Sequence, residues 1–210
     1  MLVCNRIQVL HALVFLLSLA GVSNAQDPLA GRQRTSQQVD ITSGPPPQGA
    51  VSIKESLRLS HEDGVRAIAF RPDGTLLATG TLDHRIHLFD LPSGKEVAVL
   101  EGEQGPINSV DFSPDGKTLA TGGDRTTVRL WDMASKKELR ALEGHISRVT
   151  TVAFSPDGRV LATSNFDRTV KLWDVSTGNE LRKLEGHEAR IFPVAFLPDG
   201  KGIVTGSFDK

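Results

Sequence analysis

Short hydrophobic runs, each closed by Pro-Asp-Gly, recur along the chain after about residue 60. They are Val65 to Phe70, Ile107 to Phe112, Val149 to Phe154 and Ile191 to Phe196. Proline fixes φ and glycine tolerates a positive φ, so each Pro-Asp-Gly predicts a tight turn. The apolar residues after each turn therefore predict a returning strand, beginning with Leu76 to Thr79.

Alternating apolar residues then predict a third strand in three of these segments, at Ile86 to Phe89, Val128 to Trp131 and Val170 to Trp173. Ser93-Gly94 and Thr177-Gly178 predict turns into a fourth strand. That strand is expected at Glu96 to Leu100 and at Glu180 to Leu184. The pattern as a whole predicts an all-β chain.

The same markers return every 42 residues. The turn tetrapeptides begin at Arg71, Ser113, Ser155 and Leu197. Three further sets keep this interval: Phe89-Asp90, Trp131-Asp132 and Trp173-Asp174; Ala78-Thr79, Ala120-Thr121, Ala162-Thr163 and Val204-Thr205; and the loop residues His61, Glu103, His145 and His187. Four strands in a period of about 42 residues indicate the blade of a β-propeller.

The third period carries the most specific residues, which are His145 after Gly144, Leu161-Ala162-Thr163, Asp167 and Val170-Lys171-Leu172-Trp173-Asp174. With its Ser-Pro-Asp-Gly turn, this period resembles the repeat of the WD-repeat β-propeller family. The resemblance covers about residues 57 to 210, with repeats at about 57–98, 99–140, 141–182 and a partial repeat at 183–210. It implies a propeller of four-stranded antiparallel blades.

The resemblance also implies a hydrogen-bonded tetrad in each blade, made of a loop His, a second-strand Thr, a turn Asp and a third-strand Trp. The matching residues are His61, Thr79 and Asp83; Thr121 and Trp131; His145, Thr163, Asp167 and Trp173; and His187, Thr205 and Asp209. Only the third repeat has all four members. The first repeat has Phe89 in place of Trp.

The second repeat departs from the tetrad at two positions that are expected to touch. Glu103 stands at the His position and Arg125 at the Asp position. Opposite charges at these two positions suggest a substitute ion pair. The alternative is that both side chains point into solvent, since exposed pairs contribute only about 0 to 1 kcal/mol.

The ring is expected to be incomplete. Residues 53–210 hold about 3.8 periods, whereas closed propellers have typically about four to eight blades. Ile53 to Ser60 is expected to be the outermost strand that, in this family, pairs with the last blade. Three explanations stay open: a fragment of a longer protein, which we favour, two chains that self-associate to complete one ring, or a strained four-bladed closure.

The first 25 residues have the order of a signal peptide: basic Arg6, the apolar run Ile7 to Ala20, and small residues Ser23 and Ala25. We expect cleavage after Ala25; the alternative is an uncleaved N-terminal anchor. Residues 26–52 are rich in Gln, Ser and Pro and predict a flexible linker. Export to the periplasm or the extracellular space follows, without membrane attachment after cleavage.

The amino-acid composition excludes several kinds of binding partner and of metal site. Lys and Arg number 24 against 25 Asp and Glu, which gives no reason to expect nucleic acid or an anionic membrane surface. The single cysteine, Cys4, excludes a disulfide framework and a multi-cysteine metal site. His84 and His87 are the remaining metal candidates, but three-residue spacing on a strand places them on opposite faces. We expect both to be solvated and predict no metal site.

No catalytic motif occurs: nucleophile elbow, phosphate-binding loop, zinc-protease pair and haem-attachment sequence are all missing. No cofactor is therefore expected. In WD-repeat proteins the residues beside the start of each first strand commonly touch partners. The matching residues are Gly64 and Arg66, Pro106 and Asn108, Arg148 and Thr150, and Arg190 and Phe192.

Phe192 is the sharpest of these candidates, because a large apolar side chain at a rim would anchor a partner; the alternative is a packing role. The arginines favour an acidic partner surface. The leading prediction is a non-enzymatic, exported scaffold for protein–protein interaction, with an unidentified protein partner. The alternative is an accessory portion of a larger exported oxidoreductase or hydrolase whose catalytic part is absent, and a third is a small-molecule site in the central channel.

Overall fold

The structure, a computed structural model, describes residues 59–209. The predicted signal peptide, the linker and most of the expected strand Ile53 to Ser60 lie outside this range. Every regular element in the described range is a β-strand, which confirms the all-β prediction. The strands are β1 (Val65–Phe70), β2 (Leu76–Thr81), β3 (Ile86–Asp90), β4 (Lys95–Leu100), β5 (Ile107–Phe112), β6 (Thr118–Gly123), β7 (Val128–Asp132), β8 (Lys137–Leu142), β9 (Val149–Phe154), β10 (Val160–Asn165), β11 (Val170–Asp174), β12 (Glu180–Leu184), β13 (Ile191–Phe196) and β14 (Ile203–Ser207).

The strands form four antiparallel sheets, which we call the first to fourth blades. The first three each pair four strands in chain order, β1 to β4, β5 to β8 and β9 to β12, and the fourth pairs β13 with β14. The predicted first strands match β1, β5, β9 and β13, while β2 runs two residues beyond its predicted end at Thr79. Side chains at the end of β2 accordingly belong to the sheet.

The Pro-Asp-Gly segments form the turns that the sequence predicts. Gly158 has φ of 72°, a left-handed conformation that glycine adopts without steric cost. Ser155 Oγ donates to Asp157 Oδ1 at 2.6 Å and accepts from the Val160 N–H at 2.9 Å. The recurring aspartates are therefore bound within their own turns, and β9 and β10 leave each turn in a fixed register.

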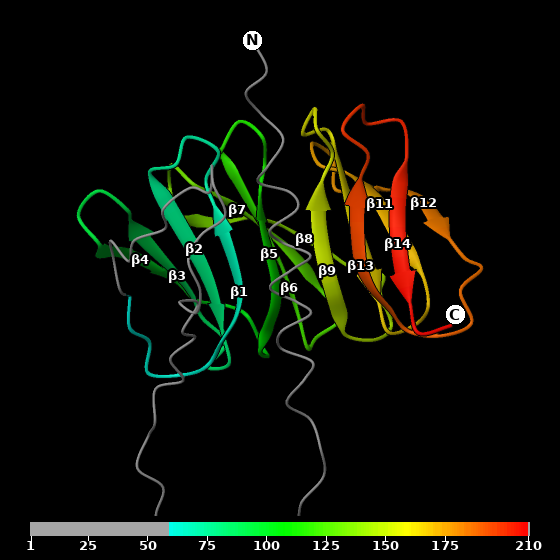
Figure 1. The fold of residues 1–210 in the computed structure, drawn as a ribbon, viewed down its shortest axis with the longest axis horizontal. Coiled ribbons are helices and arrows are strands. Elements are labelled where there is room, and N and C mark those ends of the chain that lie inside the picture. The colour runs from blue at the N-terminus through cyan, green and yellow to red at the C-terminus, as the bar shows by residue number, and fades with distance from the viewer. Residues whose placement is uncertain (1–58, 210) are drawn as a thin grey trace, which may run out of the picture.

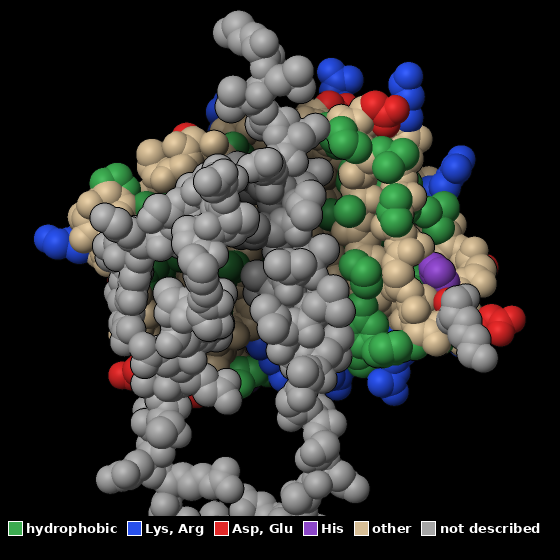
Figure 2. All heavy atoms as spheres, in the orientation of Figure 1, with side chains coloured by type: hydrophobic (Ala, Val, Ile, Leu, Met, Phe, Trp, Pro, Cys, Tyr) green, Lys and Arg blue, Asp and Glu red, His purple; other side chains and the backbone are tan. Residues whose placement is uncertain are grey.

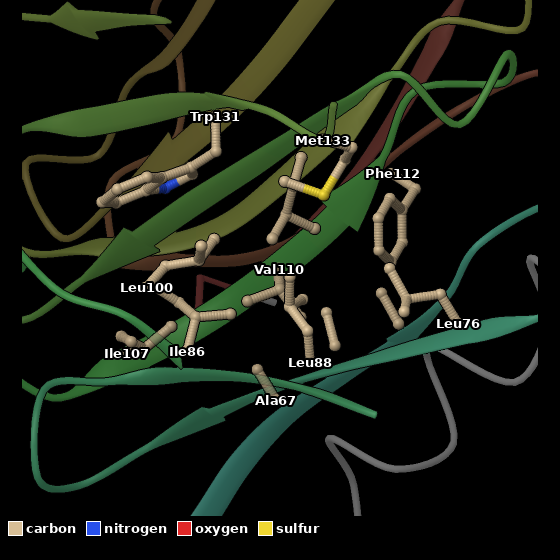
Figure 3. Packing of buried hydrophobic residues seen from close by; sticks show 13 residues of the cluster. Ala67, Leu76, Ile86, Leu88, Leu100, Ile107, Val110, Phe112, Trp131 and Met133 are labelled. Atoms are coloured by element: carbon tan, nitrogen blue, oxygen red, sulfur yellow. The ribbon is translucent and has the colours of Figure 1, made fainter. Parts of the chain in front are cut away.

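Hydrophobic cores lie between successive blades rather than inside any one of them. The first core joins Ile86 and Leu88 of β3 to Ile107 and Val110 of β5, all at most 2% exposed, with Trp131 beside them (Figure 3). A second core joins the second blade to the third, and another joins the third to the fourth. Each blade thus depends on its neighbour for burial, as expected of a repeat protein.

The described blades do not close into a ring. Strands β1, β5, β9 and β13 pack in that order, and the blades fan out across Figure 1 with the first and fourth at opposite ends. Val65 in β1 is 42% exposed, whereas Ile107, Val149 and Ile191 at the same repeat position are at most 1% exposed. In residues 59–209, no helix has the length and hydrophobicity needed to cross a membrane.

Candidate functional site

The tetrad residues of the third blade lie together beneath its surface. Trp173 Nε1 donates to Thr163 Oγ1 at 2.8 Å, and Thr163 Oγ1 lies 2.6 Å from His145 Nε2. His145 Nδ1 faces Asp167 Oδ2 at 3.6 Å, an electrostatic contact that is too long for a hydrogen bond. Since the indole can only donate, each group is best satisfied when the Thr163 hydroxyl donates to an unprotonated Nε2.

Burial controls the charge of this histidine. The side chain of His145 is fully buried, and desolvation lowers its pKa to about 4, although the Asp167 carboxylate favours the charged form. Burial also acts to raise the pKa of Asp167, but the Thr169 hydroxyl and N–H donate to its carboxylate and lower the pKa overall. At neutral pH the third blade therefore holds a neutral imidazole beside a carboxylate.

The first and fourth blades contain shorter versions of this chain. His187 Nε2 lies 2.8 Å from Thr205 Oγ1, and its Nδ1 lies 2.9 Å from Asp209 Oδ2. In the first blade His61 Nε2 lies 3.2 Å from Thr79 Oγ1, and Phe89 meets the His61 ring edge-on at 5.2 Å. Asp83 instead accepts from the Thr81 hydroxyl.

The second blade corrects the expected pair between Glu103 and Arg125. Glu103 accepts from the Thr121 hydroxyl, and its other oxygen lies 3.5 Å from Arg129 Nε. Arg125 donates to the Gln104 carbonyl at 2.9 Å and is exposed. The prediction that these two side chains pair was wrong, because Arg129 on β7 reaches the buried carboxylate directly. Solvation of Glu103 was wrong as well, since its side chain is 5% exposed.

Trp131 completes this second-blade chain by donating from Nε1 to Thr121 Oγ1 at 3.0 Å. Burial raises the pKa of Glu103, while the hydrogen bond from Thr121 and the charge of Arg129 act against that rise. A Trp–Thr–Glu–Arg chain thus takes the place of the tetrad.

A second recurring interaction was missed by the sequence analysis. Arg129 pairs with Glu138, Lys171 pairs with Glu180, and His87 Nδ1 lies 3.1 Å from Glu96 Oε1. Each basic residue stands two positions before the aromatic residue of its third strand, and each glutamate lies on the adjacent fourth strand. The constant interval between Glu96, Glu138 and Glu180 was the signal that could have revealed these pairs.

His87 also corrects an expectation. Its side chain is only 16% exposed and packs against the rings of His61 and Phe89, rather than being solvated. His84 is exposed, as expected. Within residues 59–209, no three His, Cys, Asp or Glu residues are grouped so as to hold a metal ion.

The edge that carries the partner-binding candidates, here called the rim, is built by one repeated backbone contact. The residue after each second strand donates its N–H to the carbonyl of the residue before the first strand. These bonds join Leu82 to Gly64, Asp124 to Pro106, Phe166 to Arg148 and Phe208 to Arg190. Side chains from two loops therefore meet at the rim of each blade.

Three rim candidates form one polar network across blades. Arg66 Nη1 donates to Asn108 Oδ1 at 2.9 Å, and Asn108 Nδ2 donates to Asp124 Oδ1 at 2.8 Å. Asp124 also lies 3.7 Å from Arg66 and 3.5 Å from Arg148. Residues of the first, second and third blades thus share one carboxylate, which the sequence analysis did not single out.

Thr150 does not belong to the exposed rim. It is 2% exposed, and its hydroxyl donates to the Ile191 carbonyl at 2.8 Å. Its placement at the rim was wrong because the hydroxyl reaches the fourth blade at Ile191, and Ser164 on β10 of its own blade contacts it at 2.8 Å. Thr150 joins neighbouring blades.

Phe192 occupies the centre of an aromatic cluster. Its ring lies 5.2 Å from that of Phe166 and 4.9 Å from that of Phe208, both edge-on. Arg190 and Arg148 lie over the Phe166 ring at 4.7 and 5.1 Å. Phe192 is half-buried and packs within this cluster, while Phe208 is 64% exposed. Phe166 and Phe208 are rim residues that the sequence analysis missed.

The family model described as "WD domain, G-beta repeat" matches residues 54–90, 94–132, 136–174 and 178–210. The chain belongs to the WD-repeat family. Each match after the first begins with the fourth strand of one blade and continues into the first strands of the next. WD-repeat domains mediate protein–protein interactions, generally as non-catalytic scaffolds. Among curated proteins, none matches this sequence.

This WD-repeat chain separates its polar residues into two groups. The Trp–Thr–His chain of the third blade and the Trp–Thr–Glu chain of the second are buried and hold strands together, while the chains of the first and fourth blades are half-buried. The rim residues Arg66, Arg148 and Arg190 are exposed. A protein surface that meets the rim would find a rigid edge that carries charged and aromatic groups.

Proposed function

We propose that this chain is a non-enzymatic scaffold that binds a protein partner through its rim. One observation carries the proposal: the polar network of Arg66, Asn108, Asp124 and Arg148 runs across three blades at a single edge. Strands fix the ends of every rim loop, so the surface is preorganised and little order has to be gained on binding. Such a network suits a partner that spans several blades.

Variation among repeats supports the same surface. The position of Arg66 holds Asn108, Thr150 and Phe192 in the later repeats, while the Thr that accepts the indole hydrogen bond recurs in each. The framework residues are constrained by packing; among the varying residues Arg66 is exposed and free of that constraint, whereas Thr150 is buried between blades. Function in WD-repeat folds resides in such sites rather than in the fold itself.

We further propose that the protein is exported to the periplasm or the extracellular space and that the chain is part of a longer propeller. The basic, apolar and small residues of positions 1–25 support export. Within residues 59–209 strand β14 pairs only with β13, and this free edge and the exposed Val65 in β1 support additional blades.

The test compares affinity capture by the full chain with capture by an Asn108→Ala variant. Asn108 joins the rim network and donates to the Val149 carbonyl at 3.0 Å. We expect a captured partner, once purified, to bind the variant about tenfold or more weakly. Ser176→Ala, an exposed change in the turn between β11 and β12, is the control and should bind as the unaltered chain does.

Equal binding to both variants would contradict a rim interface. Turnover of an oxidoreductase or hydrolase substrate by the captured protein would instead favour the accessory-enzyme alternative.

A further inference from the structure

A shallow hollow of about 440 Å³ opens at the rim between the third and fourth blades. Its lining residues are Phe166, Arg168, Glu188, Ala189, Arg190 and Phe208. Figure 2 shows hydrophobic side chains close to Lys and Arg side chains at the lower edge of the molecule, where β14 ends in Figure 1. The hollow therefore combines an apolar wall with positive charge.

The two arginines of this hollow differ from those of the neighbouring network. Arg66 and Arg148 both lie within 4.0 Å of Asp124, so their charges are partly compensated. No carboxylate of residues 59–209 lies within 4.0 Å of the guanidinium group of Arg168 or Arg190. Both arginines are exposed, and Glu188 is the single acid of the lining. The guanidinium groups of Arg168 and Arg190 are therefore available to pair with a carboxylate of a ligand.

The aromatic residues of the hollow, Phe166 and Phe208, further restrict which ligand can bind there. Arg190 and Arg148 already lie over the Phe166 ring, so the π face of this ring is occupied by cations and a ligand cation would be repelled. Phe208 is 64% exposed and presents an apolar ring beside them. An apolar side chain can pack on Phe208 while a neighbouring carboxylate reaches a guanidinium group.

We propose that this hollow binds a partner segment in which acidic residues flank a large apolar or aromatic side chain. The carboxylates pair with Arg168 and Arg190, and the apolar side chain packs against the exposed ring of Phe208. The inference rests on the proposed function, because it assigns part of the rim interface to one kind of peptide. It also replaces Phe192 as the apolar anchor with the more exposed Phe208.

The test measures binding of a labelled synthetic peptide that alternates glutamate with phenylalanine to the full chain by fluorescence anisotropy. Two comparison peptides replace phenylalanine by alanine or glutamate by lysine. We expect each comparison peptide to bind about tenfold or more weakly, and raising the salt from about 0.05 to 0.5 M to weaken the first peptide.

The matched variants are Arg168→Glu with Arg190→Glu, and Arg182→Glu as a control on the exposed face of β12. The double variant should lose about tenfold or more in affinity, and the control should bind as the unaltered chain does. Phe208→Ala, a change at an exposed side chain, gives the same test if the double variant melts at a lower temperature than the control.

Equal binding of the three peptides, or unchanged binding in both the double variant and Phe208→Ala, would overturn this proposal. The experiments can disprove the acidic-peptide site without disproving the broader scaffold function. If a captured partner loses affinity for Asn108→Ala but keeps it for Arg168→Glu with Arg190→Glu, the rim interface stands and the acidic-peptide site does not.

Discussion

The Thr163 hydroxyl has two buried hydrogen-bonding neighbours, whereas the equivalent Thr79 hydroxyl has one neighbour, which is half-buried. Thr163 accepts from the Trp173 indole and contacts His145, while Thr79 contacts only His61 among these groups. Replacing Thr163 by valine leaves both neighbours unpaired, with an expected cost of about 2 to 4 kcal/mol in the free energy of unfolding. Thr79→Val should cost about 1 kcal/mol.

Urea denaturation of both variants measures this difference. Equal losses would mean that the indole hydrogen bond adds nothing to the stability of the third blade. The comparison is matched because both threonines are buried at the same repeat position.

Arg129 is the charge partner of the buried Glu103. Arg129→Met should lower the free energy of unfolding by about 3 kcal/mol, because it leaves a buried carboxylate without a cation. Arg125→Met should change it by less than about 0.5 kcal/mol, since that side chain is exposed. The Arg129→Met loss should be smaller at pH 5 than at pH 8, because Glu103 can then take up a proton. If chemical denaturation at either pH shows a larger loss of unfolding free energy for Arg125→Met than for Arg129→Met, the predicted pair between Glu103 and Arg125 would be correct after all.

The lowered pKa of His145 predicts a pH-dependent stability. Between its folded value of about 4 and its ordinary value of 6.5, the unfolded chain binds a proton that the folded chain does not. The free energy of unfolding should therefore fall as the pH is lowered from 7 to 5, by about 2 kcal/mol from this group. Glu103, whose pKa is raised, acts in the opposite direction, so stability gained through it falls as the pH rises.

Denaturation of the full chain and of His145→Asn at both pH values isolates the histidine contribution. The variant should lack most of the dependence, while a parallel change in both proteins would assign the effect to other groups.

At the scale of elements, the turn before each fourth strand contains a residue with positive φ. Gly94 and Gly178 have φ of 67° and 76°, and Lys136 at the same repeat position has φ of 56°. A side chain in this region costs roughly 1 to 2 kcal/mol. Lys136→Gly should therefore raise the free energy of unfolding by about 0.5 to 1 kcal/mol after the added chain entropy is counted. The expected result is a higher midpoint of thermal unfolding.

Lys137→Gly, one residue later in β8, is the control and should lower the midpoint, because glycine weakens a strand. Two changes of the same sign would mean that the turn conformation has no energetic role.

The strands were predictable because their signals are local: Pro-Asp-Gly turns, alternating apolar residues and a fixed interval. The Trp173, Thr163 and His145 cluster followed from the resemblance, since those residues return at constant spacing. Arg129 was missed because a residue on β7 reaches a loop that lies 26 positions earlier. Phe166 and Asp124 were missed because their roles depend on contacts between blades, which no periodic pattern specifies.

At the scale of the whole molecule, stability is expected to follow the number of neighbours that each blade has. The three cores lie between blades, so an inner blade is covered on both faces and an end blade on one. Phe70 of β1 is 40% exposed, whereas Phe112 and Phe154 are at most 5% exposed. Such arrays gain stability from each interface between neighbours.

One substitution made at equivalent positions in two blades tests this arrangement. Val149 is fully buried between blades, and Val149→Ala should lower the free energy of unfolding by about 2 to 3 kcal/mol. Val65 is 42% exposed at the same repeat position, so Val65→Ala should cost less than about 1 kcal/mol. Chemical denaturation of the full chain gives both values, and light scattering on the same samples reports whether two chains associate.

A loss of unfolding free energy for Val65→Ala as large as that for Val149→Ala would mean that the end face of the first blade is buried in solution. A dimer in the light scattering would then show that a second copy of the chain buries this face.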